Sequence, residues 1–211
     1  LWAALAAVLT GRPWPSVARS GRAMPSRQPL CSDCPYVPLL RALGTVMERH
    51  GGREAFIVTG ETGCMVRAQL PPWQILDAKY GMGGSIALAA GLVRSGVSQP
   101  VVALAGDSAL LHSGLAGLVD AAQAGLPLLV VVLDNGTTAL SGGQPHPGSG
   151  RDVHGRPRRP VDLAALVAAA GARPVHVVDP HDEQATQAAL EDGLAARSAA
   201  VVIARHPCPH L

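Results

Sequence analysis

Two short polar motifs, each directly after an apolar run, contain the residues best suited to chemistry. Gly106-Asp107-Ser108 follows the run 101–105, and Asp134-Asn135-Gly136-Thr137 follows the run 128–133, so 28 positions (135 − 107) separate Asp107 from Asn135. Small divalent cations prefer hard oxygen ligands and retain phosphate oxygens in their shell. We therefore predict that Asp107, Asn135 and the Thr137 carbonyl bind Mg²⁺ beside a phosphate. The alternative is a helix-capping Asp and a simple Asn-Gly turn.

The elements that position these motifs alternate along the chain. From residue 34 onward, short β-branched runs alternate with longer helical stretches, which indicates an α/β fold: a doubly wound, mostly parallel sheet with helices on both faces. We predict strands at 55–59, 101–105, 128–133, 174–178 and 200–204, and helices at 38–49, 85–94, 113–124, 162–170 and 182–197. In an open parallel sheet, ligands bind where the strands end at their carboxyl edge. Asp107 and Asn135 should meet there.

A glycine cluster precedes the first motif by one crossover. Tyr80-Gly81-Met82-Gly83-Gly84 leads into an Ala-rich helical stretch, and glycines allow the backbone to approach a ligand closely. Met82 is either part of this ligand site or an ordinary core methionine.

Composition excludes several classes of function. The 211 residues are 48% hydrophobic and carry a net charge of +2, which suits one principal core and offers no basic stripe for nucleic acid. The apolar run 1–9 is too short to span a bilayer, and it lacks a basic leader or cleavage site. We expect no nucleic-acid partner, no membrane and a cytoplasmic location.

Two segments rich in Gly, Pro and Arg interrupt the pattern. Residues 1–29 are interpreted as a linker or the tail of a preceding domain, or else as an ordinary disordered terminus, with the main domain at 30–211. Residues 137–160 form a loop long enough to indicate function. Within it, the basic run 151–159 is either solvated or binds an anion.

The two polar motifs resemble the thiamine-diphosphate motif, whose usual form is Gly-Asp-Gly followed by Asn-Asn. Ser108 and Asp134 depart from that form but leave the metal ligands in place. Over residues 30–209 the finer resemblance is to the large subunit of indolepyruvate:ferredoxin oxidoreductase. The matching segments are Cys31-Ser32-Asp33-Cys34-Pro35-Tyr36, Gly60-Glu61-Thr62-Gly63-Cys64, Asp107-Ser108 with His112-Ser113-Gly114, Asp134 to Ala139, and Gln144-Pro145-His146-Pro147. Tyr36 replaces a His and Glu61 an Asp, so the substrate need not be an aryl pyruvate.

The resemblance implies roles for particular residues. Met82 falls at the position of the apolar wedge that bends the cofactor, and His112 and His146 are acid–base candidates near the thiazolium or the substrate carboxylate, or else solvated histidines. The implied cofactor-binding residues are Glu61, Gly63, Gly81, Met82, Gly83, Gly106, Asp107, Ser108, Asn135, Thr137 and Thr138.

The four cysteines follow the order found in related 2-oxoacid:ferredoxin oxidoreductases. Cys31 and Cys34 form a Cys-x-x-Cys pair, Cys64 follows the first predicted strand, and Cys208 lies between two prolines. The resemblance implies a [4Fe–4S] cluster. A zinc site and four unconnected thiols remain alternatives, whereas a disulfide framework is not expected.

The implied activity is oxidative decarboxylation of a 2-oxo acid to an acyl-CoA, with thiamine diphosphate as the electron sink. The implied partners are a pyrimidine-binding domain from missing N-terminal sequence or another subunit, a small oxidoreductase subunit, ferredoxin and coenzyme A, in an oligomer. Alone, the chain should bind the diphosphate end of the cofactor and be inactive. Two alternatives remain: half of a non-oxidative 2-oxoacid decarboxylase, and a non-catalytic assembly module.

Overall fold

A six-stranded parallel sheet forms the centre of the molecule. The computed structural model describes residues 30–210, so the interpretation of 1–29 as a linker lies outside the described residues. The strand order is β2-β1-β3-β4-β6-β5, and every pairing is parallel. The strands are β1 Ile57–Gly60, β2 Ala78–Lys79, β3 Val101–Gly106, β4 Leu129–Asp134, β5 Val175–Val178 and β6 Ala200–Arg205.

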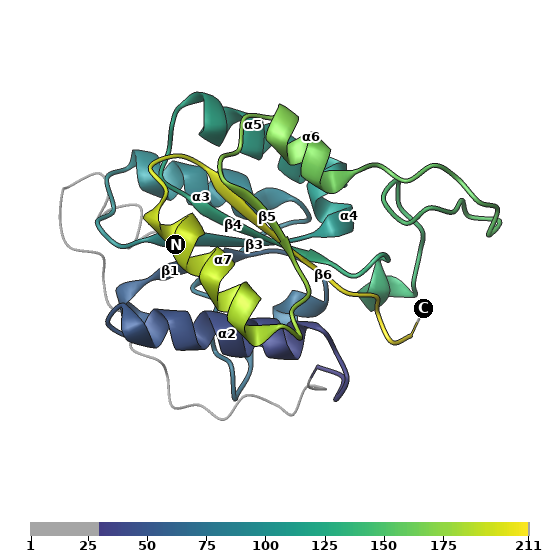
Figure 1. Cartoon of the computed structure of the whole chain (residues 1–211), viewed down its shortest axis with the longest axis horizontal. Coiled ribbons are helices and arrows are strands. Elements are labelled where there is room, and N and C mark those ends of the chain that lie inside the picture. Colours follow the sequence, from purple (N-terminus) through teal and green to yellow (C-terminus); the bar gives the residue numbers. More distant parts are fainter. Residues whose placement is uncertain (1–29, 211) are drawn as a thin grey trace.

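Helices cover both faces of this sheet (Figure 1). They are α2 Tyr36–Arg49, α3 Gly84–Arg94, α4 Asp107–Ala109, α5 Leu115–Gln123, α6 Leu163–Ala169 and α7 Glu183–Ala195. Helices α2 and α7 pack on one face, with Leu43 and Leu190 in its core, whereas α3, α5 and α6 pack on the other, with Ile86, Leu118 and Val167 in its core. The doubly wound α/β fold predicted from the sequence is confirmed.

Local sequence explains where helices begin. Asp162 and Asp182 precede α6 and α7, and their carboxylates accept backbone N–H groups of the first turn, as N-cap residues do. In the described part of the chain, no helix has the length and apolarity needed to cross a membrane.

The structure differs from the predicted elements in two places. The two-residue edge strand β2 was not predicted, because residues 78–79 carry no β-branched run. The predicted helix 113–124 is part of a longer helical stretch, since α4 and a π-helical turn, η3 Leu110–Gly114, lead into α5. The five predicted strands and the other four predicted helices occur within a few residues of their predicted bounds.

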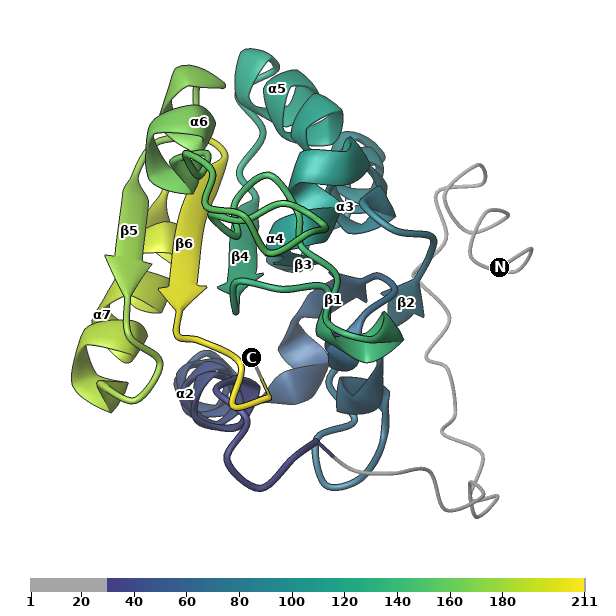
Figure 2. The ribbon, with the colours of Figure 1, turned by 90° about the vertical axis from the view of Figure 1, so that its right-hand side faces the viewer.

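The loop 137–160 is folded back on itself and runs along the carboxyl edge of the strands (Figure 2). Short bridges pair Thr138 with Gln144 and Arg151 with Pro157. Within the basic run, Arg158 forms an ion pair with Asp152 at 2.7 Å. The loop is therefore an ordered part of the edge where the polar motifs lie.

Candidate active site

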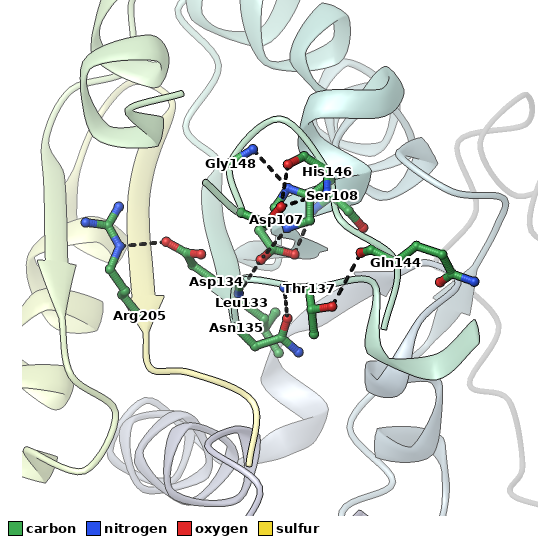
Figure 3. Close-up of polar contacts among 12 residues, drawn as sticks. Asp107, Ser108, Leu133, Asp134, Asn135, Thr137, Gln144, His146, Gly148 and Arg205 are labelled. Atoms are coloured by element: carbon green, nitrogen blue, oxygen red, sulfur yellow. Dashed lines mark hydrogen bonds and ion pairs between the residues drawn. The ribbon is translucent and has the colours of Figure 1, made fainter. Parts of the chain in front are cut away.

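The two polar motifs lie side by side because their strands are paired. Gly106 at the end of β3 is in register with Leu133 of β4, so the residues that follow, Asp107 and Asn135, meet at the same edge (Figure 3). Both are buried, with 2% and 5% of their surfaces exposed. The structure thus brings together the predicted metal ligands Asp107, Asn135 and Thr137.

Hydrogen bonds hold the Asp107 carboxylate in place. Its Oδ1 accepts the backbone N–H of Ser108 at 2.7 Å, and its Oδ2 accepts the N–H of Gly136 at 2.8 Å. His146 Nε2 lies 3.2 Å from Oδ2. These contacts fix the orientation of a carboxylate whose oxygens are of the kind that Mg²⁺ prefers.

Asn135 and Thr137 are held by the second motif and by the loop. Asn135 Oδ1 accepts the N–H of Thr137 at 3.1 Å, and the Thr137 hydroxyl donates to the Gln144 carbonyl at 3.4 Å. The N–H of Thr138 also donates to that carbonyl, at 3.0 Å. Loop 137–160 therefore fixes the segment that carries two of the three predicted ligands.

A cavity of about 220 Å³ opens beside these residues. Eight of the predicted cofactor-binding residues line it: Gly63, Met82, Gly106, Asp107, Ser108, Asn135, Thr137 and Thr138. Tyr36 and Leu140 also line it, and were not predicted as cofactor contacts. Tyr36 had a signal in the sequence, since it stands where the resembling family has a His.

The predicted cofactor residue Glu61 lies beneath the cavity and does not line it. Its side chain is fully buried; Oε1 accepts the N–H of Gly106 at 2.8 Å and Oε2 accepts the Ser85 hydroxyl at 3.4 Å. Burial raises the pKa of Glu61 from its usual 4.5 to about 7, although hydrogen bonds from Gly106, Gly83 and Ser85 oppose the shift. Glu61 thus joins the glycine segment, residues 80–84, to the end of β3.

We expect Glu61→Gln to change how stability depends on pH. A folded-state pKa raised above the unfolded value stabilises the fold below pH 4.5, and this contribution is lost as the pH rises through about 7. One pKa unit corresponds to about 1.4 kcal/mol. Between pH 4.5 and about 7, the free energy of unfolding of the wild type should therefore fall by roughly 3 kcal/mol relative to that of Glu61→Gln. Urea unfolding of both proteins at several pH values measures this fall.

The matched control is Glu48→Gln, which removes one exposed carboxyl group from α2. A difference between wild type and Glu61→Gln that stays constant from pH 4.5 to 7 would show that Glu61 has no raised pKa.

The glycine segment is fastened to the helical stretch after Asp107. The Ser113 hydroxyl donates to the Met82 carbonyl at 2.7 Å. Gly83 has φ +76°, and a Cβ built there would lie 2.1 Å from Ser113 Oγ. Gly83 therefore permits close packing, whereas Gly81 is exposed and has open space around it. Neither glycine lines the cavity.

The two predicted acid–base histidines occupy different surroundings. His112 is exposed on η3, with Nδ1 3.1 Å from the Ser113 hydroxyl, and it does not line the cavity. His146 is buried behind Asp107, also outside the cavity lining. Neither imidazole therefore faces the cavity in this structure.

The four cysteines line one cavity of about 310 Å³. It shares five lining residues with the cofactor cavity: Cys64, Asn135, Thr137, Ala139 and Leu140. Burial raises the pKa of Cys34 to about 11 and also raises that of Cys64, so these thiols are protonated near neutral pH and would release protons on binding a metal. The structure therefore places the cysteines directly beside the cofactor cavity.

The distances between the cysteine sulfurs can be compared with those in a tetrahedral zinc site. No three of the four sulfurs lie within 4.8 Å of one another; among the described residues, only Asp179, His181 and His206 form such a close group of ligand atoms. Tetrahedral zinc with Zn–S bonds of about 2.3 Å brings its sulfurs to about 3.8 Å. The four sulfurs are therefore not grouped as closely as the ligands of a tetrahedral zinc site.

Parallel strands, a carboxylate and an amide at their shared edge, and an adjoining cavity are typical of a ligand-binding α/β domain. A family model described as thiamine pyrophosphate enzyme, C-terminal TPP binding domain, matches residues 43–204. The chain belongs to this family.

Among its relatives are indolepyruvate oxidoreductase subunits IorA. The subunit of Methanothermobacter marburgensis is 32% identical over 187 residues, and that of Pyrococcus abyssi is 34% identical over 199 residues. Each alignment covers 88% of this chain and 30% of the relative. The chain therefore spans about 30% of the length of these relatives.

Solved structures share the fold. The 2-oxoglutarate:ferredoxin oxidoreductase of Magnetococcus marinus superposes with a TM-score of 0.79 at 20% identity, covering 88% of this chain and 66% of that one. A thiamine diphosphate-dependent 4-hydroxybenzoylformate decarboxylase of Rhodococcus jostii gives 0.60 at 20% identity, covering 88% and 35%. Both likenesses concern the fold alone.

Proposed function

We propose that the chain is the thiamine-diphosphate and Mg²⁺ binding domain of a 2-oxoacid:ferredoxin oxidoreductase of the indolepyruvate type, which oxidatively decarboxylates a 2-oxo acid to an acyl-CoA. The observation that carries the proposal is the shared wall between two cavities. One cavity is lined by Asp107 and Asn135, the other by all four cysteines, and Cys64 lines both.

The first cavity fits the diphosphate end of the cofactor. Asp107, Asn135 and the Thr137 carbonyl would hold Mg²⁺, because a carboxylate and two neutral oxygens are ligands that this ion accepts together with phosphate oxygens. Met82 lines the same cavity and would support the thiazolium ring. When bound, thiamine diphosphate supplies the electron sink for decarboxylation.

The second cavity fits a [4Fe–4S] cluster. Cys31, Cys34, Cys64 and Cys208 would bind its irons, and their spacing is wider than tetrahedral zinc requires. A cluster held there would supply one-electron transfer next to the cofactor cavity, with ferredoxin as the expected acceptor. Free thiols of this kind persist in reducing compartments, which favours the cytoplasm.

Other parts of the enzyme would come from elsewhere. The aminopyrimidine ring needs a second binding domain, which we assign to further sequence or another subunit; the IorA relatives are more than three times the length aligned here. Coenzyme A and a small oxidoreductase subunit complete the assembly. The active site would lie at the interface between this domain and the pyrimidine-binding domain.

The test is a calorimetric titration of anaerobically purified protein with thiamine diphosphate, with and without Mg²⁺, together with the visible spectrum and iron and sulfide analysis of the same sample. We expect Mg²⁺-dependent binding and a brown chromophore that Cys208→Ser loses. Binding without iron would favour a non-oxidative decarboxylase. No binding even with the pyrimidine-binding domain supplied would overturn the proposal and favour an assembly module.

A further inference from the structure

His146 has a buried ring nitrogen that lacks a proper hydrogen bond. Its side chain is 6% exposed, and Nε2 has no partner of good geometry among the described residues. Asp107 Oδ2 lies 3.2 Å from this nitrogen. Buried polar atoms without a partner are rare because each costs free energy, so this one calls for an explanation.

The loop determines which ring nitrogen carries the proton. The N–H of Gly148 donates to His146 Nδ1 at 3.2 Å. In a neutral imidazole, one nitrogen accepts and the other donates. Since Nδ1 accepts, the nitrogen left to donate is Nε2, which faces the Asp107 carboxylate.

The backbone around His146 is fastened by one serine. The N–H of His146 donates to the Ser149 hydroxyl at 3.0 Å, and this hydroxyl donates to the His146 carbonyl at 2.7 Å. The N–H of Ser149 donates to the same carbonyl at 2.9 Å. The imidazole is therefore held at a defined position within an otherwise long loop, close to the carboxylate.

We propose that His146 is a positioning residue for the metal site: its Nε2, which lies 3.2 Å from Oδ2 of Asp107 without a well-aligned hydrogen bond, donates to that oxygen when the carboxylate binds the cation and keeps the carboxylate oriented. The proposal rests on the proposed function. His146 does not line the cofactor cavity, so it acts through Asp107 and not on the substrate. Groups that orient a metal ligand in this way contribute about 10- to 100-fold to metal affinity.

Two substitutions separate this role from a purely structural one. His146→Asn keeps an acceptor near the position of Nδ1, which serves Gly148, but lacks a donor near Nε2. His146→Gln places an amide donor near Nε2. The full chain and each variant would be titrated with Mg²⁺ alone and with Mg²⁺ at saturating thiamine diphosphate, and the melting temperature of the metal-free protein would be measured. His154→Asn, at an exposed histidine of the same loop, is the matched control.

We expect His146→Asn to raise the dissociation constant for Mg²⁺ by about 10- to 100-fold, and His146→Gln to restore it to within about threefold of wild type. If His146→Asn binds Mg²⁺ as well as wild type does, or if Gln weakens binding as much as Asn, the positioning role is wrong. If wild type itself fails to bind Mg²⁺ and thiamine diphosphate, with the pyrimidine-binding domain also supplied, the proposed function fails first.

Discussion

Asp107→Asn is expected to raise the dissociation constant for thiamine diphosphate in the presence of Mg²⁺ by more than about 100-fold, because loss of a direct ligand should exceed the 10- to 100-fold effect of losing a group that only orients one. The carboxylate is the only charged group among the three predicted ligands, so an amide in its place removes the main attraction for the cation. Calorimetry with and without Mg²⁺ measures the effect, and most of the Mg²⁺ dependence should disappear.

Asp120→Asn is the matched control, since it makes the same chemical change at a half-exposed carboxylate that pairs with Arg94 at 2.9 Å. It should bind the cofactor as wild type does. Asp107 also accepts two backbone N–H groups, so the melting temperature of the cofactor-free variant must be compared with wild type. Unchanged, Mg²⁺-dependent binding by a folded Asp107→Asn protein would remove Asp107 from the metal site.

Gly83→Ala is expected to lower the free energy of unfolding by about 3–4 kcal/mol. A left-handed backbone costs a residue with a Cβ about 1–2 kcal/mol, and overpacking costs about 1–3 kcal/mol more. The new methyl group would meet the backbone nitrogen of Gly114 at 2.7 Å and the Ala109 carbonyl at 2.9 Å, and these backbone atoms cannot rotate away. Urea unfolding of the cofactor-free chain measures the loss.

Gly81→Ala provides the comparison within the same segment. A Cβ at Gly81 meets nothing within 4 Å, and Gly81 does not have positive φ, so this variant should differ from wild type by less than about 0.5 kcal/mol. Equal stability of the two variants would show that the tight contact at Gly83 is not present in solution.

Much of the fold could be predicted from the sequence because a buried parallel sheet has a strong signal. Strands β3, β4 and β6 are apolar on both faces, and their runs stand out between helical stretches. Strand β2 could not be predicted, since two residues, Ala78 and Lys79, form it only through pairing with β1. The π-helical turn η3 packs against residues 82 and 83 of the glycine segment, and local propensity does not describe a contact of this kind.

Part of the candidate site could likewise be predicted from the sequence, and part could not. Asp107 and Asn135 could be placed together because ends of adjacent parallel strands meet at one edge. Loop residues follow no such rule: the sequence could not show that His146 points at Asp107 or that His112 remains exposed. Glu61 was predicted to contact the cofactor because of its motif, yet its buried side chain accepts the N–H of Gly106 and does not line the cavity.

The segment after β6 joins the two cavities by one backbone hydrogen bond. The N–H of Cys208 donates to the carbonyl of Asn135 at 3.0 Å, so a cysteine of one cavity is tied to a predicted ligand of the other. A group that moved Cys208 on binding would therefore also act on Asn135, and any such coupling would be reciprocal. We expect a chain whose cysteine cavity is empty to bind thiamine diphosphate less tightly than one in which it is filled, and calorimetry on the two forms measures the difference.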